Sequence, residues 1–209
     1  MTKERLLASA ICGVAKLITG VRATWRDSRP EAGQRIYFAN HRSHGDFLLI
    51  WASLPPDLRR LTRPVAGSDY WLAGRLRRYI ITKVFRAVLI DRSPPAARPL
   101  QSPVEVMGAA LATGESLIMF PEGTRNIGDD LLPFKAGIYH LARAHPQAEL
   151  VPVWIENLGR VMPKGEFIPV PLLCSLTFGP PLGADSDESK DAFLGRARDA
   201  LVALAPQAA

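Results

Sequence analysis

Short apolar runs rich in valine and isoleucine alternate along the chain with longer stretches whose apolar residues recur every three or four positions. The short runs predict strands, and the longer stretches predict helices with one buried face. We expect strands at 35–39, 63–66, 87–91, 116–120, 149–155 and 172–178. We expect helices at 4–24, 45–54, 69–84, 103–113, 135–145 and 187–204. This alternation predicts an α/β fold with a mostly parallel central sheet flanked by helices.

The first predicted helix is amphipathic. Its apolar stripe recurs at alternating steps of four and three residues and consists of Leu7, Ile11, Val14, Ile18, Val21 and Trp25. Basic residues accompany the stripe at Lys3, Arg5, Lys16, Arg22 and Arg26. The pattern fits a helix lying on an anionic bilayer, and it fits equally a helix docked on its own domain. The apolar segment 6–21 is too short to span a bilayer, and no small-residue cleavage site of a signal peptide follows it.

The length of the chain is suited to one substantial core. The chain has 209 residues, of which 47% are hydrophobic, and a chain of this size is expected to form one domain. Proline-rich segments at 54–56, 93–99 and 163–171 predict loops that are too short to be domain linkers. We therefore expect an N-terminal amphipathic, membrane-associating helix within residues 1–30 and one α/β domain at 31–209.

The charge of the chain favours anionic partners. Lys and Arg number 26 against 20 Asp and Glu, which gives a formal charge of +6. Phospholipid headgroups and phosphorylated metabolites suit this charge, whereas no nucleic-acid-binding motif or stacking-aromatic pattern is present, so no nucleic acid partner is expected. Cys12 and Cys174 lie far apart and belong to no metal-ligand spacing, so neither a disulfide framework nor a zinc site is expected. A reducing cytoplasm is the simplest compartment.

A polar cluster, NHRSHGD at 40–46, follows the strand predicted at 35–39. Ser43 and Asp46 form a helix-capping pattern, which leaves His41 unexplained. Alternatively, His41 is a general base whose other ring nitrogen meets Asp46, with the nucleophile coming from the substrate. The chain has no G-x-S-x-G motif that would supply a protein nucleophile. His41, His44 and Asp46 have no recognised metal-ligand spacing, so no metal is expected.

A second loop with several polar residues, FPEGTR at 120–125, follows the strand predicted at 116–120. Backbone N–H groups, the Thr124 hydroxyl and the Arg125 guanidinium would lie near one spot, a combination suited to a phosphate. The alternative is an ordinary turn in which Arg125 pairs with Glu122 on the surface.

Together, NHRSHGD at 40–46, FPEGTR at 120–125 and VPV at 151–153 resemble the glycerolipid acyltransferase family of 1-acyl-glycerol-3-phosphate acyltransferases. The resemblance runs from about residue 35 to 180. His41 to Asp46 and Glu122 to Arg125 match the two most specific blocks of the family, and AVLIDR at 87–92 and PFKAGIYHLA at 133–142 resemble two further blocks. In the last of these, Phe134, Lys135 and Gly137 match, although a helix start with a buried aromatic would explain them equally well.

The resemblance implies a glycerolipid acyltransferase-like fold and a reaction. His41 would deprotonate an acceptor hydroxyl, Asp46 would orient His41, and the acceptor oxygen would attack an acyl thioester of coenzyme A or acyl carrier protein. The acceptor implied is a lysophospholipid, 1-acyl-sn-glycerol-3-phosphate, which would give phosphatidic acid. Its phosphate would be held by Glu122, Gly123, Thr124 and Arg125, with Arg92 as a further anion-binding residue. No tightly bound cofactor is implied, and the expected location is the cytoplasmic face of an anionic membrane, as a peripheral or monotopic protein.

The chain departs from the family in the middle block. Many members carry a lysine where VAGSDYW, at 65–71, has Ala66, Gly67 and Ser68. Positive charge follows later instead, at Arg75, Arg77, Arg78 and Lys83. Another lysolipid or hydroxylated lipid therefore stays open as the acceptor. Two other classes also stay open: a thioesterase or lipid hydrolase in which His41 activates water, and a non-enzymatic protein that binds anionic lipid.

Overall fold

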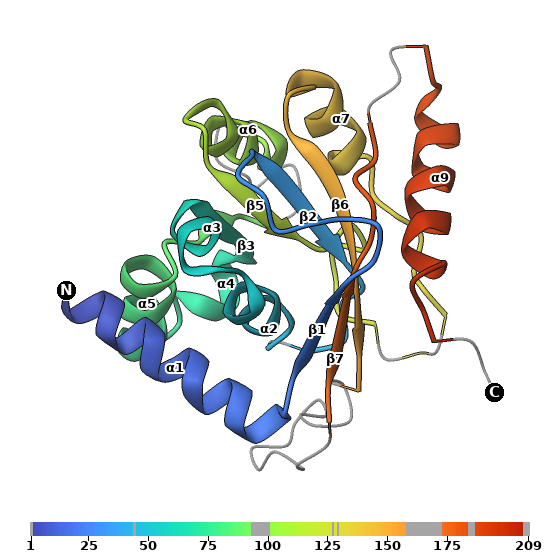
Figure 1. Cartoon of the computed structure of the whole chain (residues 1–209). Helices are drawn as coiled ribbons and strands as arrows, with labels where there is room; N and C mark the ends of the chain where they lie inside the picture. Colours follow the sequence, from blue (N-terminus) through green and yellow to red (C-terminus); the bar gives the residue numbers. More distant parts are fainter. Residues whose placement is uncertain are drawn as a thin grey trace.

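The computed structural model describes residues 2–43, 45–92, 101–126, 128, 130–157, 173–183 and 187–206. Within these residues the strands form one seven-stranded sheet in the order β1-β7-β6-β2-β5-β3-β4 (Figure 1). The strands are β1 (Arg22–Trp25), β2 (Arg35–Ala39), β3 (Thr62–Gly67), β4 (Val88–Ile90), β5 (Ser116–Met119), β6 (Glu149–Glu156) and β7 (Ser175–Phe178). The pairings are parallel except that of β6 with β7. The predicted fold class, a mostly parallel sheet flanked by helices, is confirmed.

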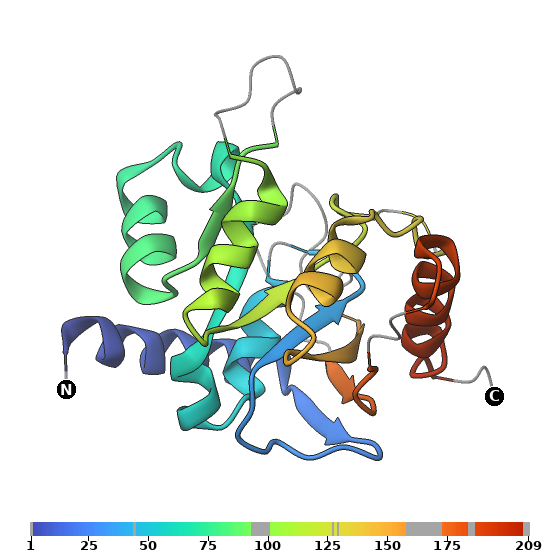
Figure 2. The ribbon, with the colours of Figure 1, turned by 90° about the horizontal axis from the view of Figure 1, so that it is seen from above.

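Helices cover both faces of the sheet. They are α1 (Lys3–Thr19), α2 (Asp46–Ser53), α3 (Pro56–Leu61), α4 (Ser68–Trp71), α5 (Arg75–Tyr79), the π-helix η1 (Ile80–Val84), α6 (Pro103–Ala112), α7 (Gly137–Ala144) and α9 (Lys190–Val202). Alternate residues of β2 enter two separate cores: Tyr37 packs with residues of α1, α2 and η1, and Phe38 packs with residues of α6, α7 and α9. Figure 2 shows these helices around the sheet from above. Burial on both faces explains why the central strands read as continuous apolar runs.

The N-terminal helix is shorter than predicted. It ends at Thr19 because Gly20, the C-cap residue, has the left-handed backbone conformation (φ 52°) that glycine adopts without strain. Residues 22–25 then form β1, which pairs with β7. Trp25 therefore does not belong to the helical stripe, and its ring stacks on Phe178 with centroids 4.0 Å apart.

Other predicted elements differ in their bounds. The helix predicted at 69–84 is divided into α4, α5 and η1, because Gly74 is extended (φ −149°) between α4 and α5. The prediction missed α3, which begins with Pro56 at its first turn, a position that tolerates proline. The predicted loops at 93–99 and 163–171 lie outside the described residues, as does the start of the strand predicted at 172–178. The division of the chain near residue 30 stays a prediction.

Helix α1 lies against α2 and η1 (Figure 1). It packs through small side chains, with Ala8 and Cys12 buried. Its larger apolar side chains are instead exposed, namely Leu6, Leu7, Val14, Leu17 and Ile18. The helix is therefore docked on its own domain and also presents apolar side chains to the outside. None of the described helices is long and apolar enough to cross a membrane.

Candidate active site

The order of the strands brings together the two polar loops at 40–46 and 120–125. Strands β2 and β5 are parallel neighbours, so the loops that follow Ala39 and Met119 leave the same edge of the sheet. This edge is where α/β folds place their binding sites. The loops are joined directly: the N–H of Asn126 donates to the carbonyl oxygen of His41 at 2.7 Å, and the N–H of His41 donates to Glu122 Oε1 at 2.7 Å.

His41 and Asp46 form the expected pair. Nδ1 of His41 lies 2.8 Å from Oδ2 of Asp46. The same oxygen accepts hydrogen bonds from the N–H groups of Arg42 (2.7 Å) and Ser43 (2.8 Å). A carboxylate oxygen only accepts, so Nδ1 carries the hydrogen and Nε2 is left as the basic nitrogen. The pair thus holds the imidazole in the tautomer that a general base requires.

Asp46 has a structural position as well. It is the first residue of α2, whose N-cap is Gly45 with no side-chain cap hydrogen bond, so the capping of this helix by Ser43 that the sequence pattern predicted is wrong. Asp46 instead accepts the N–H of Ser43, and the hydroxyl of Ser43 accepts the N–H of Gly45. The residue is 0% exposed, and within the described residues its Oδ1 has no hydrogen-bond partner. Its charge is therefore compensated by the N–H groups of Arg42 and Ser43 and by the imidazole of His41, and a buried carboxylate in contact with an imidazole favours positive charge on that ring.

The ring of His41 is also held by an aromatic contact that the sequence analysis missed. The imidazole stacks on Phe120, with ring centroids 4.2 Å apart and an angle of 16° between the planes. Asp46 and Phe120 therefore fix the ring from its edge and from its face. Phe120 directly follows β5, and its place at that strand end is the sequence signal that could have indicated this contact.

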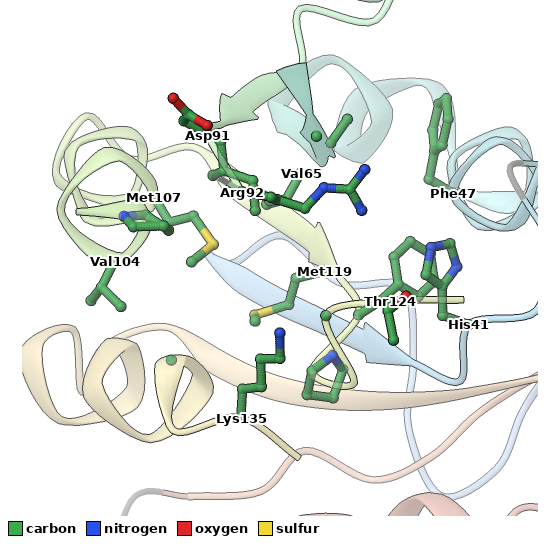
Figure 3. A pocket seen from close by; sticks show the side chains of 18 of the residues that line it. His41, Phe47, Val65, Asp91, Arg92, Val104, Met107, Met119, Thr124 and Lys135 are labelled. Carbon is green, nitrogen blue, oxygen red and sulfur yellow. The ribbon is translucent and has the colours of Figure 1, made fainter. Parts of the chain in front are cut away.

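His41 lines a cavity of about 750 Å³. Figure 3 shows side chains that line this cavity. One part of the wall is apolar and includes Phe47, Val65, Ile90, Val104, Met107, Met119 and Ile138. Another part carries charge and includes Asp69, Asp91, Arg92, Arg125 and Lys135. The cavity thus combines a basic nitrogen, an apolar lining and a group of cations.

Arg92, Thr124 and Arg125 line the cavity as expected of anion-binding residues. Arg92 forms an ion pair with Asp69, with Nη2 2.9 Å from Oδ1. The hydrogen bond from Arg92 lowers the pKa of Asp69. Arg125 forms no ion pair with Glu122, nor with another described carboxylate, so the surface pairing considered from the sequence is absent.

Of the two other residues expected at the phosphate, Gly123 lines the cavity and Glu122 does not. Glu122 is buried and does not line the cavity. Its two oxygens accept the N–H groups of His41 (2.7 Å) and Leu132 (3.1 Å), so it joins the loops. The N–H of Gly123 donates to the Phe120 carbonyl at 3.0 Å, closing a turn in which Gly123 has φ 70°. A side chain would strain the backbone there.

Asp69 and Lys135 were not identified as site residues from the sequence. Asp69 comes two residues after the end of β3, which neighbours β5, so the strand-end rule could have found it. Lys135 lies between the loop and α7 and becomes part of the site only in three dimensions. His44 lies outside the described residues, and within the described part of the chain no three His, Cys, Asp or Glu residues gather as a metal site would require.

Comparison with known proteins agrees with this geometry. A family model described as Acyltransferase matches residues 20–156. The chain belongs to the Acyltransferase family. The residues that line the cavity or hold His41, from His41 to Ile138, all fall within the matched segment.

Individual relatives extend the comparison. The chain is 31% identical over 186 residues to a 1-acyl-sn-glycerol-3-phosphate acyltransferase of Limnanthes douglasii, covering 86% of this chain and 61% of that one. It is 32% identical over 131 residues to the Salmonella typhimurium protein of that name, covering 60% and 48%. The chain thus spans less than two thirds of the length of these acyltransferases. The crystal structure of the 1-acyl-sn-glycerophosphate (LPA) acyltransferase PlsC of Thermotoga maritima has the same fold, with a TM-score of 0.74 at 19% identity, covering 95% of this chain and 77% of that one.

Proposed function

We propose that the protein is an O-acyltransferase that moves a fatty acyl group from an acyl thioester to the hydroxyl of 1-acyl-sn-glycerol-3-phosphate, giving phosphatidic acid. The observation that carries this proposal is the pair of His41 and Asp46, 2.8 Å apart, at the wall of a cavity that also holds Arg92 and Arg125. The names of the relatives from Limnanthes and Salmonella support the choice of acceptor.

The chemistry follows from the position of the free nitrogen. Nε2 of His41 accepts the proton of the acceptor hydroxyl while its oxygen attacks the thioester carbonyl carbon. Asp46 stabilises the imidazolium that forms. The tetrahedral intermediate then collapses: the C–S bond breaks, the imidazolium returns its proton to the leaving thiolate, and the new ester bond remains. The protein needs no nucleophile of its own, since the substrate supplies it.

The cations explain why the acceptor would be phosphorylated. Arg125 offers a planar guanidinium without a carboxylate partner among the described residues, and such a group binds two phosphate oxygens at once. Thr124 lines the same cavity and carries a hydroxyl, and Arg92 adds a second guanidinium. The apolar wall suits an acyl chain. Both coenzyme A and acyl carrier protein present the acyl group as a thioester, and either would serve as the donor without a bound cofactor.

We also propose that the protein binds the cytoplasmic face of an anionic membrane as a peripheral or monotopic protein. The exposed apolar side chains of α1 support this, with Leu17 85% exposed. Helix α5 extends the same surface, because the Tyr79 hydroxyl lies 3.4 Å from Glu4 Oε1 and Leu76 is 71% exposed. Basic side chains accompany these residues, at Lys3, Arg5, Lys16, Arg75 and Arg78. Apolar burial together with attraction to anionic lipid is the combination that holds such helices at an interface.

The test is an assay that follows both possible fates of the acyl group. The purified protein would be incubated with acyl-coenzyme A or acyl-carrier protein, with and without lysophosphatidic acid, in anionic vesicles. We expect phosphatidic acid with one or both donors and little free fatty acid. Release of fatty acid at the same rate without acceptor would establish a hydrolase instead, and the absence of both products would favour a lipid-binding protein.

A further inference from the structure

Two glycines at the cavity are covered by cationic side chains. Gly67 ends β3 and lies under Arg92, and a Cβ atom on it would collide with the Nε of Arg92. Gly123 lies under Lys135, and a Cβ atom there would lie 2.7 Å from Cε and from Nζ of Lys135. Neither glycine could carry a side chain unless the cation moved. The side chains of Arg92 and Lys135 thus cover backbone at or just after the ends of the neighbouring strands β3 and β5.

Lys135 is held in this position by its own backbone. Its N–H donates to the carbonyl oxygen of Pro121 at 2.9 Å, so the start of its side chain is fixed to the loop that contains Gly123. The side chain then runs over Gly123 into the cavity. Figure 3 shows it pointing up toward Met119, from the side of the cavity opposite Arg92 in that view.

Among the described residues, three cations line the cavity, Arg92, Arg125 and Lys135, against two carboxylates, Asp69 and Asp91, so positive charge exceeds negative charge. Arg92 is paired with Asp69. Lys135 and Arg125 have no ion-pair partner among the described carboxylates, and Glu122 is occupied by two backbone N–H groups. Cations that face one cavity repel one another, so an anion placed between them is favoured by all of them.

We propose that Lys135 is an anion-binding residue of this site, which binds a phosphate group of a substrate together with Arg92, and that Gly123 positions its ammonium. The inference rests on the proposed function and adds a residue to it. The group bound by Lys135 is a phosphate. It belongs either to the acceptor lipid or to the acyl donor, and the experiment distinguishes the two.

The experiment compares Lys135→Met with Lys135→Arg and, as a matched control, Lys190→Met, which removes an exposed lysine of α9 that is remote from the cavity lining. The Met side chain keeps the length of the lysine but removes its charge. For Lys135→Met we expect the KM for one phosphate-bearing substrate to rise about tenfold, the value of one charge-assisted hydrogen bond, with kcat less affected. Lys135→Arg should retain most of the affinity, and Lys190→Met should behave as the parent protein.

Two pairs of substrates separate these two sources of phosphate. A loss with lysophosphatidic acid that is absent with monoacylglycerol assigns Lys135 to the acceptor. A loss with acyl-coenzyme A that is absent with an acyl-N-acetylcysteamine thioester, which has no phosphate, assigns it to the donor. A folded Lys135→Met protein with unchanged KM for both phosphate-bearing substrates would overturn the proposal.

A binding measurement keeps this test separate from the proposed function. Inorganic phosphate should raise the thermal midpoint of the parent protein and of Lys190→Met, and it should raise that of Lys135→Met less. If the parent protein transfers no acyl group yet shows this difference, the proposed function fails and the anion site stands. Equal shifts in all three proteins would remove the anion site.

The role of Gly123 is tested by a double-mutant cycle. Gly123→Ala places a methyl group where the Lys135 side chain lies, so its effect on KM should be much smaller in the Lys135→Met background than in the parent. Equal effects in both backgrounds would mean that Gly123 acts only through its own turn, and the positioning part of the proposal would be withdrawn.

Discussion

The buried carboxylate of Glu122 accepts a hydrogen bond from the backbone N–H of His41 at 2.7 Å, across loops that lie far apart in the sequence. Its other oxygen accepts the N–H of Leu132 at 3.1 Å. Glu122 therefore fixes the backbone from which the imidazole projects. The residue belongs to the site through the position of His41, and its role toward the acceptor phosphate stays a prediction.

Glu122→Gln should weaken this connection. The amide has one acceptor oxygen, so one of the two N–H groups loses its partner, and we expect the free energy of unfolding to fall by about 1–3 kcal/mol. Because His41 would shift, kcat should fall more than KM rises. Urea unfolding and steady-state kinetics measure the two effects, with Glu31→Gln at an exposed loop position as the control. Unchanged stability and kcat in Glu122→Gln would show that the connection is dispensable.

His41→Ala should abolish the base while leaving the fold intact, because His41 lies in a loop at the edge of the core. A loss of kcat on the order of a hundredfold or more is expected when a general base is removed.

Asp46→Asn should lower kcat as well, and it should also destabilise the protein, because Asp46 Oδ2 accepts two backbone N–H groups. Circular dichroism and single-turnover kinetics separate the two variants. Near-normal turnover in folded His41→Ala would end this mechanism.

Arg125→Ala should raise the KM for lysophosphatidic acid and leave the dependence on the donor nearly unchanged. Arg125→Lys should recover only part of the affinity, because an ammonium cannot make the paired hydrogen bonds of a guanidinium. Initial rates with phosphorylated and phosphate-free acceptors measure the effect. Equal penalties with both acceptors would mean that Arg125 does not bind the phosphate.

Leu17→Ser should reduce binding to anionic vesicles without destabilising the protein, because this side chain is 85% exposed. Substitution suits this question better than deletion of the helix, since Ala8 and Cys12 are part of the core. The control is Leu61→Ser, at an exposed position of α3. Vesicle sedimentation at two salt concentrations gives the apolar and electrostatic contributions. Equal binding of both variants and the parent would exclude this face as the membrane-binding surface.

Cys174 should be unreactive in the folded protein. Burial, together with the nearby Asp46 charge, raises the pKa of Cys174 from 9.0 to about 11. The thiol therefore stays protonated at pH 8, and iodoacetamide should label it only after unfolding. Because the folded-state pKa is the higher one, the associated stability is present below pH 9 and is lost as pH rises toward 11. Mass spectrometry of labelled native protein is the measurement, and rapid native labelling of Cys174 at pH 8 would contradict the burial.

The sequence by itself was sufficient to predict the features of the fold and of the site that depend on a local pattern of residues. Continuous apolar runs predicted β2 and β5 because strands covered on both faces have no polar alternation, and their ends are near the predicted positions. The polar clusters after these strands indicated His41, Asp46 and Arg125, since side chains at the carboxyl ends of parallel strands meet at one edge of the sheet. The spacing of His41 and Asp46 was enough to predict their contact, because only one short turn of chain separates them.

The tertiary structure decided the features that depend on distant partners. Residues 22–25 continue a helical stripe by sequence, yet they form β1 because β7 offers an open edge for pairing. Glu122 was expected to hold the phosphate, but it is buried and its oxygens accept the N–H groups of Leu132, in the same loop region, and of His41, 81 residues away in sequence. Lys135 lines the same cavity as Arg92 because the loop before α7 returns to Pro121. Such contacts are set by the packing of the whole chain, so no local pattern of residues contains them.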